Sequence, residues 1–238
     1  MRKFREIIFF LILLISISSC EKKKTVEFEF EKAVMTEIFP SLVDSICVDS
    51  RKMLPPPMLG VYVTDKEGHV SEDSTKATKV QLIEYRKWKK DRERIEKDTS
   101  KVVIAFDPFL KKGDFRFSNN NNLEKKYPFL ETYIEDDDTI KAYRFDYEKL
   151  KLHNNFKLKN LSEFPKEKFR NEIYDLKYDF VFSGVLYLSR IQFDKQRRSG
   201  ILEAGFSYCG RCGRGFIIFI KKKDAKWVVD KIQRTWIS

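Results

Sequence analysis

The chain has 238 residues, and its 42% hydrophobic and 14% aromatic content is enough for a packed core and excludes a disordered protein. Its formal net charge is +11, but 36 acidic residues accompany the 47 lysines and arginines. Because the sequence has no compact basic cluster, we expect a solvated surface and no nucleic-acid partner.

The first nineteen residues have the order of segments that directs export. Arg2, Lys3 and Arg5 form a basic start, Ile7–Ile17 is an apolar run, and small residues follow. This order predicts a secretory signal peptide over residues 1–19. The apolar run is about eleven residues long, which is too short for the roughly twenty that span a bilayer.

The end of this segment, Ile17-Ser18-Ser19-Cys20, resembles the lipobox of bacterial lipoproteins. The resemblance implies cleavage before Cys20 and acylation of its thiol and new N-terminus with chains such as palmitate. Two or more acyl chains hold a protein stably on a membrane. Cys20 is therefore the expected lipid attachment site, and the membrane is an expected partner. An ordinary signal peptide with a chance cysteine and an uncleaved anchor are the alternatives.

Residues 20–26 are expected to form a charged tether between the lipid and the folded part. Glu21 is followed by three lysines, Lys22–Lys24. In surface-exported lipoproteins of the Bacteroidota type, the residues after the lipidated cysteine are usually acidic. The basic tether therefore favours a cell-envelope protein anchored to the outer membrane on its periplasmic face.

Residues 27–238 are expected to form a single α+β globular domain. The segment Glu27–Ile46 carries apolar residues at spacings of three and four, which predicts one apolar face of a helix. Pro40 should either kink this helix or start a second one, because proline lacks the backbone N–H. We expect the apolar face to pack in the core; a partner-binding face is the alternative.

The next hundred residues alternate between extended and helical patterns. Three prolines make Met53–Met58 extended, as a stiff connector or as a polyproline recognition motif. Val61–Val63 predicts a short strand, and Asp65–Ala77 predicts a loop. Thr78–Lys97 predicts a helix with a solvated, highly charged face, which could alternatively bind an acidic partner. Lys101–Phe106 predicts a buried strand.

The middle of the chain, residues 111–180, gives weaker patterns. Asp136–Asp138 is an acidic run that suggests calcium, but the spacing and glycine of an EF-hand are absent, so we expect no metal there. The alternation over Phe156–Leu161 predicts a strand. Glu163–Tyr174 is mixed, and no domain boundary is predicted in this region.

The last fifty-five residues predict an antiparallel four-stranded meander. Its expected strands are Gly184–Phe193, Gly200–Tyr208, Phe216–Ile220 and Lys226–Ile237. The third strand is apolar on both faces and should lie centrally. Cys209–Gly215 is the expected connection between the second and third strands. The amphipathic helix at residues 27–46 should cover one face of this sheet.

Several short segments in this region together resemble part of uncharacterised lipoproteins of Bacteroidota. They are the LSRIQF run from Leu188, the CGRCGRG run from Cys209, the Lys226-Trp227 pair and the terminal Trp236-Ile237-Ser238. This resemblance implies no known activity. The order of strands is also loosely similar to the cone-shaped NTF2-like and cystatin-like folds, which implies a fold and no function.

The pair Cys209-x-x-Cys212 has three interpretations. A thioredoxin-type redox pair needs a helix N-terminus, but predicted strands flank this pair. A zinc knuckle needs four ligands, and the sequence has no second such pair. The third interpretation is a disulfide that rigidifies a tight hairpin, which is possible after export to an oxidising compartment. We expect this disulfide, with Cys47 left as a buried thiol.

The sequence offers no recognisable catalytic site. The two histidines, His69 and His153, stand far apart, and no nucleophile elbow, zincin, Walker or dinucleotide motif occurs. We therefore expect no catalytic residues, metal or cofactor, and a binding role, either toward an envelope protein partner or toward a small ligand in a sheet concavity. The alternatives are an enzyme with a shallow cleft near Arg190, Glu203 and Arg211, and a periplasmic immunity or inhibitor protein.

Overall fold

The computed structural model describes residues 28–113, 142–165 and 172–237. The predicted signal peptide, the lipid site Cys20, the tether and the acidic run Asp136–Asp138 lie outside the described residues. Within the described part, no helix is long and apolar enough to cross a membrane.

The predicted amphipathic helix is present and is helical without a break over residues 28–46. We call it the core helix. Its apolar face is buried, which confirms the prediction of core packing, and Pro40 does not start a second helix. The buried residues are Val34, Met35, Ile38, Phe39, Leu42, Val43 and Ile46.

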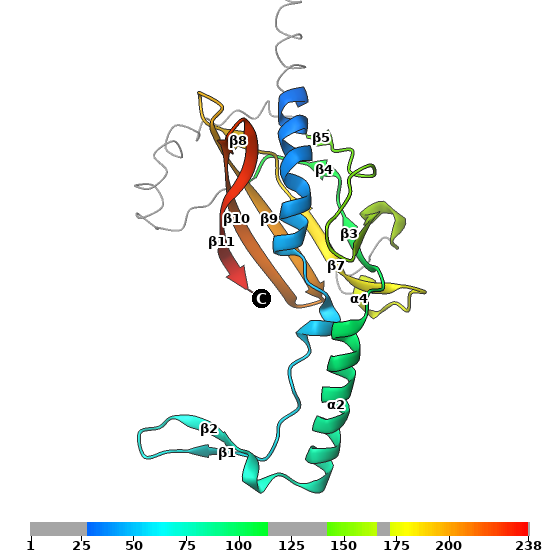
Figure 1. Cartoon of the computed structure of the whole chain (residues 1–238), viewed down its shortest axis with the longest axis vertical. Helices are drawn as coiled ribbons and strands as arrows, with labels where there is room; N and C mark the ends of the chain where they lie inside the picture. The colour runs from blue at the N-terminus through cyan, green and yellow to red at the C-terminus, as the bar shows by residue number, and fades with distance from the viewer. Residues whose placement is uncertain (1–27, 114–141, 166–171, 238) are drawn as a thin grey trace, which may run out of the picture.

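The core helix packs on a seven-stranded sheet, in front of which it lies in Figure 1. The strand order is β11-β10-β9-β7-β3-β6, with the short β8 also paired to β9. β3 runs parallel to both β6 and β7, and the remaining pairs are antiparallel, so the fold is mixed α+β. The strands are β3 (Val102–Phe106), β6 (Phe156–Asn160), β7 (Val181–Leu188), β8 (Gln192–Phe193), β9 (Ser199–Cys209), β10 (Cys212–Lys223) and β11 (Lys226–Ile237).

The C-terminal meander of β7, β9, β10 and β11 confirms the predicted architecture, with two corrections. The first predicted strand, Gly184–Phe193, is divided into β7 and β8, because the intervening Arg190 forms an ion pair with the core helix residue Glu31. The predicted connection Cys209–Gly215 is much shorter, since β9 ends at Cys209 and β10 begins at Cys212. As expected, β10 is central and is buried on both faces.

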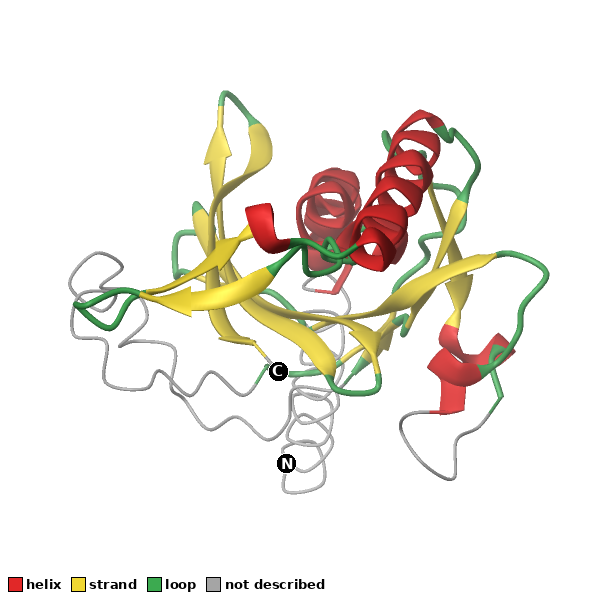
Figure 2. Cartoon of the chain, turned by 90° about the horizontal axis from the view of Figure 1, so that it is seen from below, coloured by secondary structure: helices red, strands yellow, loops and turns green. Residues whose placement is uncertain are grey.

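The two faces of the sheet carry separate clusters of apolar side chains. The cluster under the core helix includes Ile104, Leu186 and Phe206. The opposite face carries a smaller cluster around Val103 and Val185, which is covered by residues of a short 3-10 helix, η4 (Leu161–Glu163), and a short helix, α4 (Glu172–Asp175). Adjacent strands twist relative to one another, as Figure 2 shows. The face opposite the core helix is thus covered by smaller elements.

Residues 50–97 form an arm that extends away from the sheet and the core helix (Figure 1). The predicted strand at Val61 and the helix after Thr78 are both present, but the predicted loop Asp65–Ala77 contains β2, because an Asp65–Gly68 turn closes a hairpin. The arm consists of η1 (Ser50–Met53), β1 (Val61–Thr64), β2 (Val70–Asp73), η2 (Ser74–Lys76) and α2 (Lys79–Lys97).

The proline run is a connector within this arm. Trp88 of α2 donates a hydrogen bond from its indole Nε1 to the carbonyl of Leu54 over 3.3 Å, and the prolines line a hollow beside the same side chain. A further two-stranded pair, β4 (Phe109–Leu110) and β5 (Tyr143–Arg144), completes the described strands.

Candidate ligand-binding cavity

The candidate site is built on one row of residues that crosses four strands. Tyr187 of β7 pairs with Gly205 of β9, Gly205 pairs with Gly215 of β10, and Gly215 pairs with Trp236 of β11. Residues paired across neighbouring strands point to the same face of a sheet. The row therefore places two aromatic side chains on either side of two glycines.

The glycines let the Trp236 side chain lie flat on the sheet. A Cβ atom at Gly215 would overlap the indole ring at Nε1, Cδ1 and Cε2, so no residue with a side chain fits there without moving the indole. At Gly205 a Cβ atom would lie 4.0 Å from Cζ2 of the same ring, which is ordinary van der Waals contact. The indole thus covers Gly215 and reaches to the edge of Gly205.

This row forms part of the wall of a cavity of about 870 Å³ on the face opposite the core helix. This volume lies in the range of small-molecule sites. Residues from η4 and α4 form another part of the wall, including Leu161, Ile173 and Tyr174. Three large aromatic side chains of the lining remain about half exposed: Tyr187 at 45%, Trp236 at 51% and Phe109 at 53%.

Polar side chains stand at the edges of the cavity. Asp107 accepts a hydrogen bond from the Phe109 backbone N–H at Oδ1, over 3.1 Å. Asn160 accepts hydrogen bonds from the backbone N–H and the hydroxyl of Ser162. Arg211 supplies an exposed guanidinium group. The lining therefore combines an aromatic surface with hydrogen-bond donors and acceptors.

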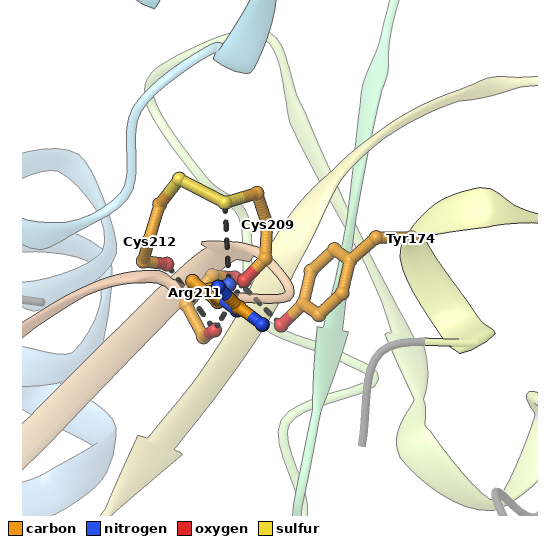
Figure 3. Close-up of a disulfide and its surroundings, with 5 residues drawn as sticks. Tyr174, Cys209, Arg211 and Cys212 are labelled. Carbon is orange, nitrogen blue, oxygen red and sulfur yellow. Dashed lines mark hydrogen bonds between the residues drawn. A yellow bond between two sulfur atoms is a disulfide. The ribbon is translucent and has the colours of Figure 1, made fainter. Parts of the chain in front are cut away.

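A disulfide joins Cys209 and Cys212 next to this cavity, which confirms the predicted pair (Figure 3). It closes a two-residue hairpin between β9 and β10, so strands flank the pair and the helix context of a redox site is missing. The Ser207 hydroxyl donates to the carbonyls of both cysteines, and the Tyr174 hydroxyl donates to the Ser207 carbonyl over 3.2 Å. These bonds fix the rim of the cavity beside Arg211.

The structure does not bring Arg190, Glu203 and Arg211 together, so the predicted shallow cleft is wrong. Arg190 lies in the interior under the core helix, while Arg211 lines the cavity on the other face. Glu203 lies between Leu202 and Ala204, which both pack under the core helix. Because successive side chains of a strand point to opposite faces, Glu203 points to the other face, but it does not line the cavity.

Arg190 has a buried partner, Glu31, that could not be recognised from the sequence. The guanidinium donates from Nε to Glu31 Oε2 over 2.9 Å, the second Glu31 oxygen accepts the Ile191 backbone N–H, and the two side chains are 10% and 2% exposed. Burial raises the pKa of the Glu31 carboxyl, although Arg190 and the Ile191 amide oppose this effect. The pair fixes the core helix to the segment between β7 and β8.

The other titratable groups in the described part of the chain do not form a built site. Asp65, Glu67 and His69 lie on the exposed hairpin turn of the arm, and one carboxylate oxygen or imidazole nitrogen of each lies within 4.8 Å of the others. The Asp65 carboxylate accepts the backbone N–H groups of Glu67 and His69, so it closes the turn. His153 pairs with Asp44 of the core helix over 3.1 Å. Cys47 is a free and buried thiol, as predicted, and burial raises its pKa.

The sequence contains one sign of this cavity, which is the glycine-rich strand that precedes a terminal tryptophan. The alignment of Gly205, Gly215 and Trp236 depends on strand register, which their spacing along the chain does not fix.

The chain matches no protein-family model, no curated protein and no solved structure.

Proposed function

We propose that this chain is a lipid-anchored protein of the cell envelope that binds a small ligand in the cavity beside Trp236. The observation that supports the binding role is a half-exposed indole lying on a glycine floor inside a cavity of about 870 Å³. Exposed aromatic surface in a concave site provides binding energy, and the polar edge provides orientation.

The anchor is supported by the order of residues 1–20, in which a short apolar run ends in the lipobox-like sequence Ile17-Ser18-Ser19-Cys20. The intact mass of the protein extracted from membranes tests it. We expect a chain of residues 20–238 that carries acyl groups, and a Cys20→Ser variant should lose them. A mature chain that starts elsewhere and carries no lipid would contradict the anchor.

Binding in the cavity is tested with N-phenyl-1-naphthylamine, an uncharged fluorescent probe with flat rings. We expect the purified protein to enhance the fluorescence of the probe, and a Trp236→Ala variant to lose most of the enhancement. Tyr62→Ala removes an exposed aromatic side chain from the arm and serves as the matched control. Equal enhancement by the wild type and Trp236→Ala would contradict the proposed site.

The arm supports a second role, which is contact with an envelope protein partner. α2 has no buried residue, and Val80 and Ile83 are 64% and 65% exposed. The helix carries eight basic and four acidic residues, and Lys87 and Lys90 continue the face of Val80 and Ile83 along it. A partner that fits this face has an apolar patch with an acidic border.

A photoreactive amino acid at position 83 tests this role in cells. We expect one discrete crosslinked adduct, and we expect Lys87→Glu together with Lys90→Glu to abolish it. The same probe at the exposed position 195, in the turn after β8, is the control for random collision. Absence of an adduct, or an adduct that survives the charge reversal, would contradict the proposed partner surface.

The similarity to NTF2-like and cystatin-like folds belongs to the same proposal. A long helix packed across a mainly antiparallel sheet supports it. The parallel strand β3, between β6 and β7, departs from a simple meander. The similarity concerns the fold and implies no ligand.

A further inference from the structure

We infer that the cavity beside Trp236 binds a neutral saccharide. This inference rests on the proposed binding function and adds the chemical class of the ligand. It depends on three features of the described lining, which are the shape of the aromatic surface, the polar groups around it and the balance of charge.

The aromatic surface is flat and open on one side. The Trp236 indole lies along the sheet because Gly215 offers no side chain beneath it, and Tyr187 stands at the other end of the same row. A pyranose ring presents apolar C–H groups on its face, and these pack against the face of an indole ring. Gly205, between the two aromatic residues, leaves room for the body of a ring.

The same cavity is bordered by polar groups that can bind the hydroxyl groups of a sugar ring. Asp107 uses Oδ1 for the Phe109 amide, and Oδ2 accepts no hydrogen bond from the described residues. Ser162 is exposed, and the Arg211 side chain has no ion pair among the residues that the structure describes. The border thus offers carboxylate, hydroxyl and guanidinium groups, which can accept from and donate to sugar hydroxyls.

The charge of the lining selects against ionic ring compounds. Among the described lining residues, Arg211 is the one basic side chain and Asp107 is the one acidic side chain. A nucleotide would bring a phosphate charge toward a border that also carries a carboxylate, with a single guanidinium to balance it. A neutral ring with many hydroxyl groups matches this border better than an anion does.

The first part of the test uses an array of immobilised bacterial and plant oligosaccharides. The array is probed with the protein from residue 27 onward, which lacks only residues outside the described fold. We expect retention on neutral glycans. The strongest glycan is then titrated in solution by calorimetry. Trp236→Ala should weaken its binding at least about tenfold, because the stacking surface is lost. Gly215→Ala should have a similar effect, because the new methyl group displaces the indole.

Tyr62→Ala is the control, and it should leave the dissociation constant unchanged. The inference is overturned if no neutral glycan is retained, if anionic compounds are retained instead, or if Trp236→Ala binds as tightly as the wild type. The phenylnaphthylamine probe separates this inference from the proposed function. If the probe still binds in a Trp236-dependent way while neutral glycans do not bind, only the assignment of the ligand as a saccharide is wrong. If neither the probe nor the glycans bind, the cavity is not the binding site.

Discussion

Trp236 lies on Gly215, its paired residue on the neighbouring strand, so that a single Cβ atom at Gly215 would overlap the indole ring. This relationship determines the shape of the candidate site. The indole belongs to the last strand and is half exposed, and it lies against the sheet because Gly215 leaves space for it.

The first prediction compares two glycines of the same row. Gly215→Ala should displace the Trp236 indole toward solvent, whereas Gly205→Ala should leave it in place, because its Cβ atom would lie 4.0 Å from the ring. Tryptophan emission in a Trp88→Phe background measures this. We expect a shift to longer wavelength only for Gly215→Ala, and identical spectra for the two variants would contradict the described packing.

The second prediction concerns the disulfide at the rim. It closes a very short loop, so replacement of Cys209 and Cys212 by serine should lower the free energy of unfolding by about 2 kcal/mol or less. Urea denaturation of the variant, and of the wild type with and without reductant, measures the change. Unfolding of the whole protein on reduction would show that the hairpin is not held by the sheet, contrary to the described fold.

The third prediction concerns the buried ion pair between Glu31 and Arg190. Glu31→Gln should lower the free energy of unfolding by about 3–5 kcal/mol, because it leaves the buried guanidinium without its carboxylate. Replacement of both residues by leucine should recover part of that loss, since no buried charge then remains, although the Ile191 amide loses its acceptor. Chemical denaturation measures both. A double variant as unstable as Glu31→Gln would indicate that the pair is needed for packing beyond its charges.

The fourth prediction concerns the base of the arm, where Arg51 in its first element pairs with Asp98, the residue that follows the arm. The Ser100 backbone amide and hydroxyl, together with Arg51, lower the pKa of Asp98 to about 2. A lowered carboxyl pKa adds stability at pH values above the ordinary pKa, near 4, and this stability is lost as the pH falls through about 2. We therefore expect the arm to loosen between pH 4 and pH 2.

Hydrogen exchange of α2 peptides measures this loosening, after correction for the intrinsic rate at each pH. Asp98→Asn should raise α2 exchange already at pH 7, with β9 and β10 unchanged. Asp91→Asn removes the exposed Asp91–Arg94 pair within α2 and is the matched control. If Asp98→Asn leaves α2 exchange unchanged, the ion pair does not hold the base of the arm.

Much of the fold follows from local patterns in the sequence. The spacing of Val34 to Ile46 predicted the core helix, and the apolar runs of β3 and β10 predicted buried strands, because side-chain period reports on the buried face. β2 escaped prediction because three of its four residues are polar and three are exposed, so no apolar period marks it. The division of β7 from β8 escaped because it depends on Glu31, which lies 159 residues from Arg190.

The candidate site was less predictable than the fold. Cys209 and Cys212 are close in sequence, so their pairing could be predicted from a hairpin alone. The cavity depends on the register that aligns Tyr187, Gly205, Gly215 and Trp236, and on cover from η4 and α4. A shift of one residue in any of these strands would turn the row to the other face, so only the assembled sheet identifies it.

The most direct test of the proposed site is amide chemical-shift mapping by NMR while the soluble protein is titrated with the glycan that binds most strongly. We expect the shifted amides to cluster on the row from Tyr187 to Trp236 and on the hairpin at Arg211. Shifts confined to the arm, or to the face under the core helix, would show that the cavity is not the binding site.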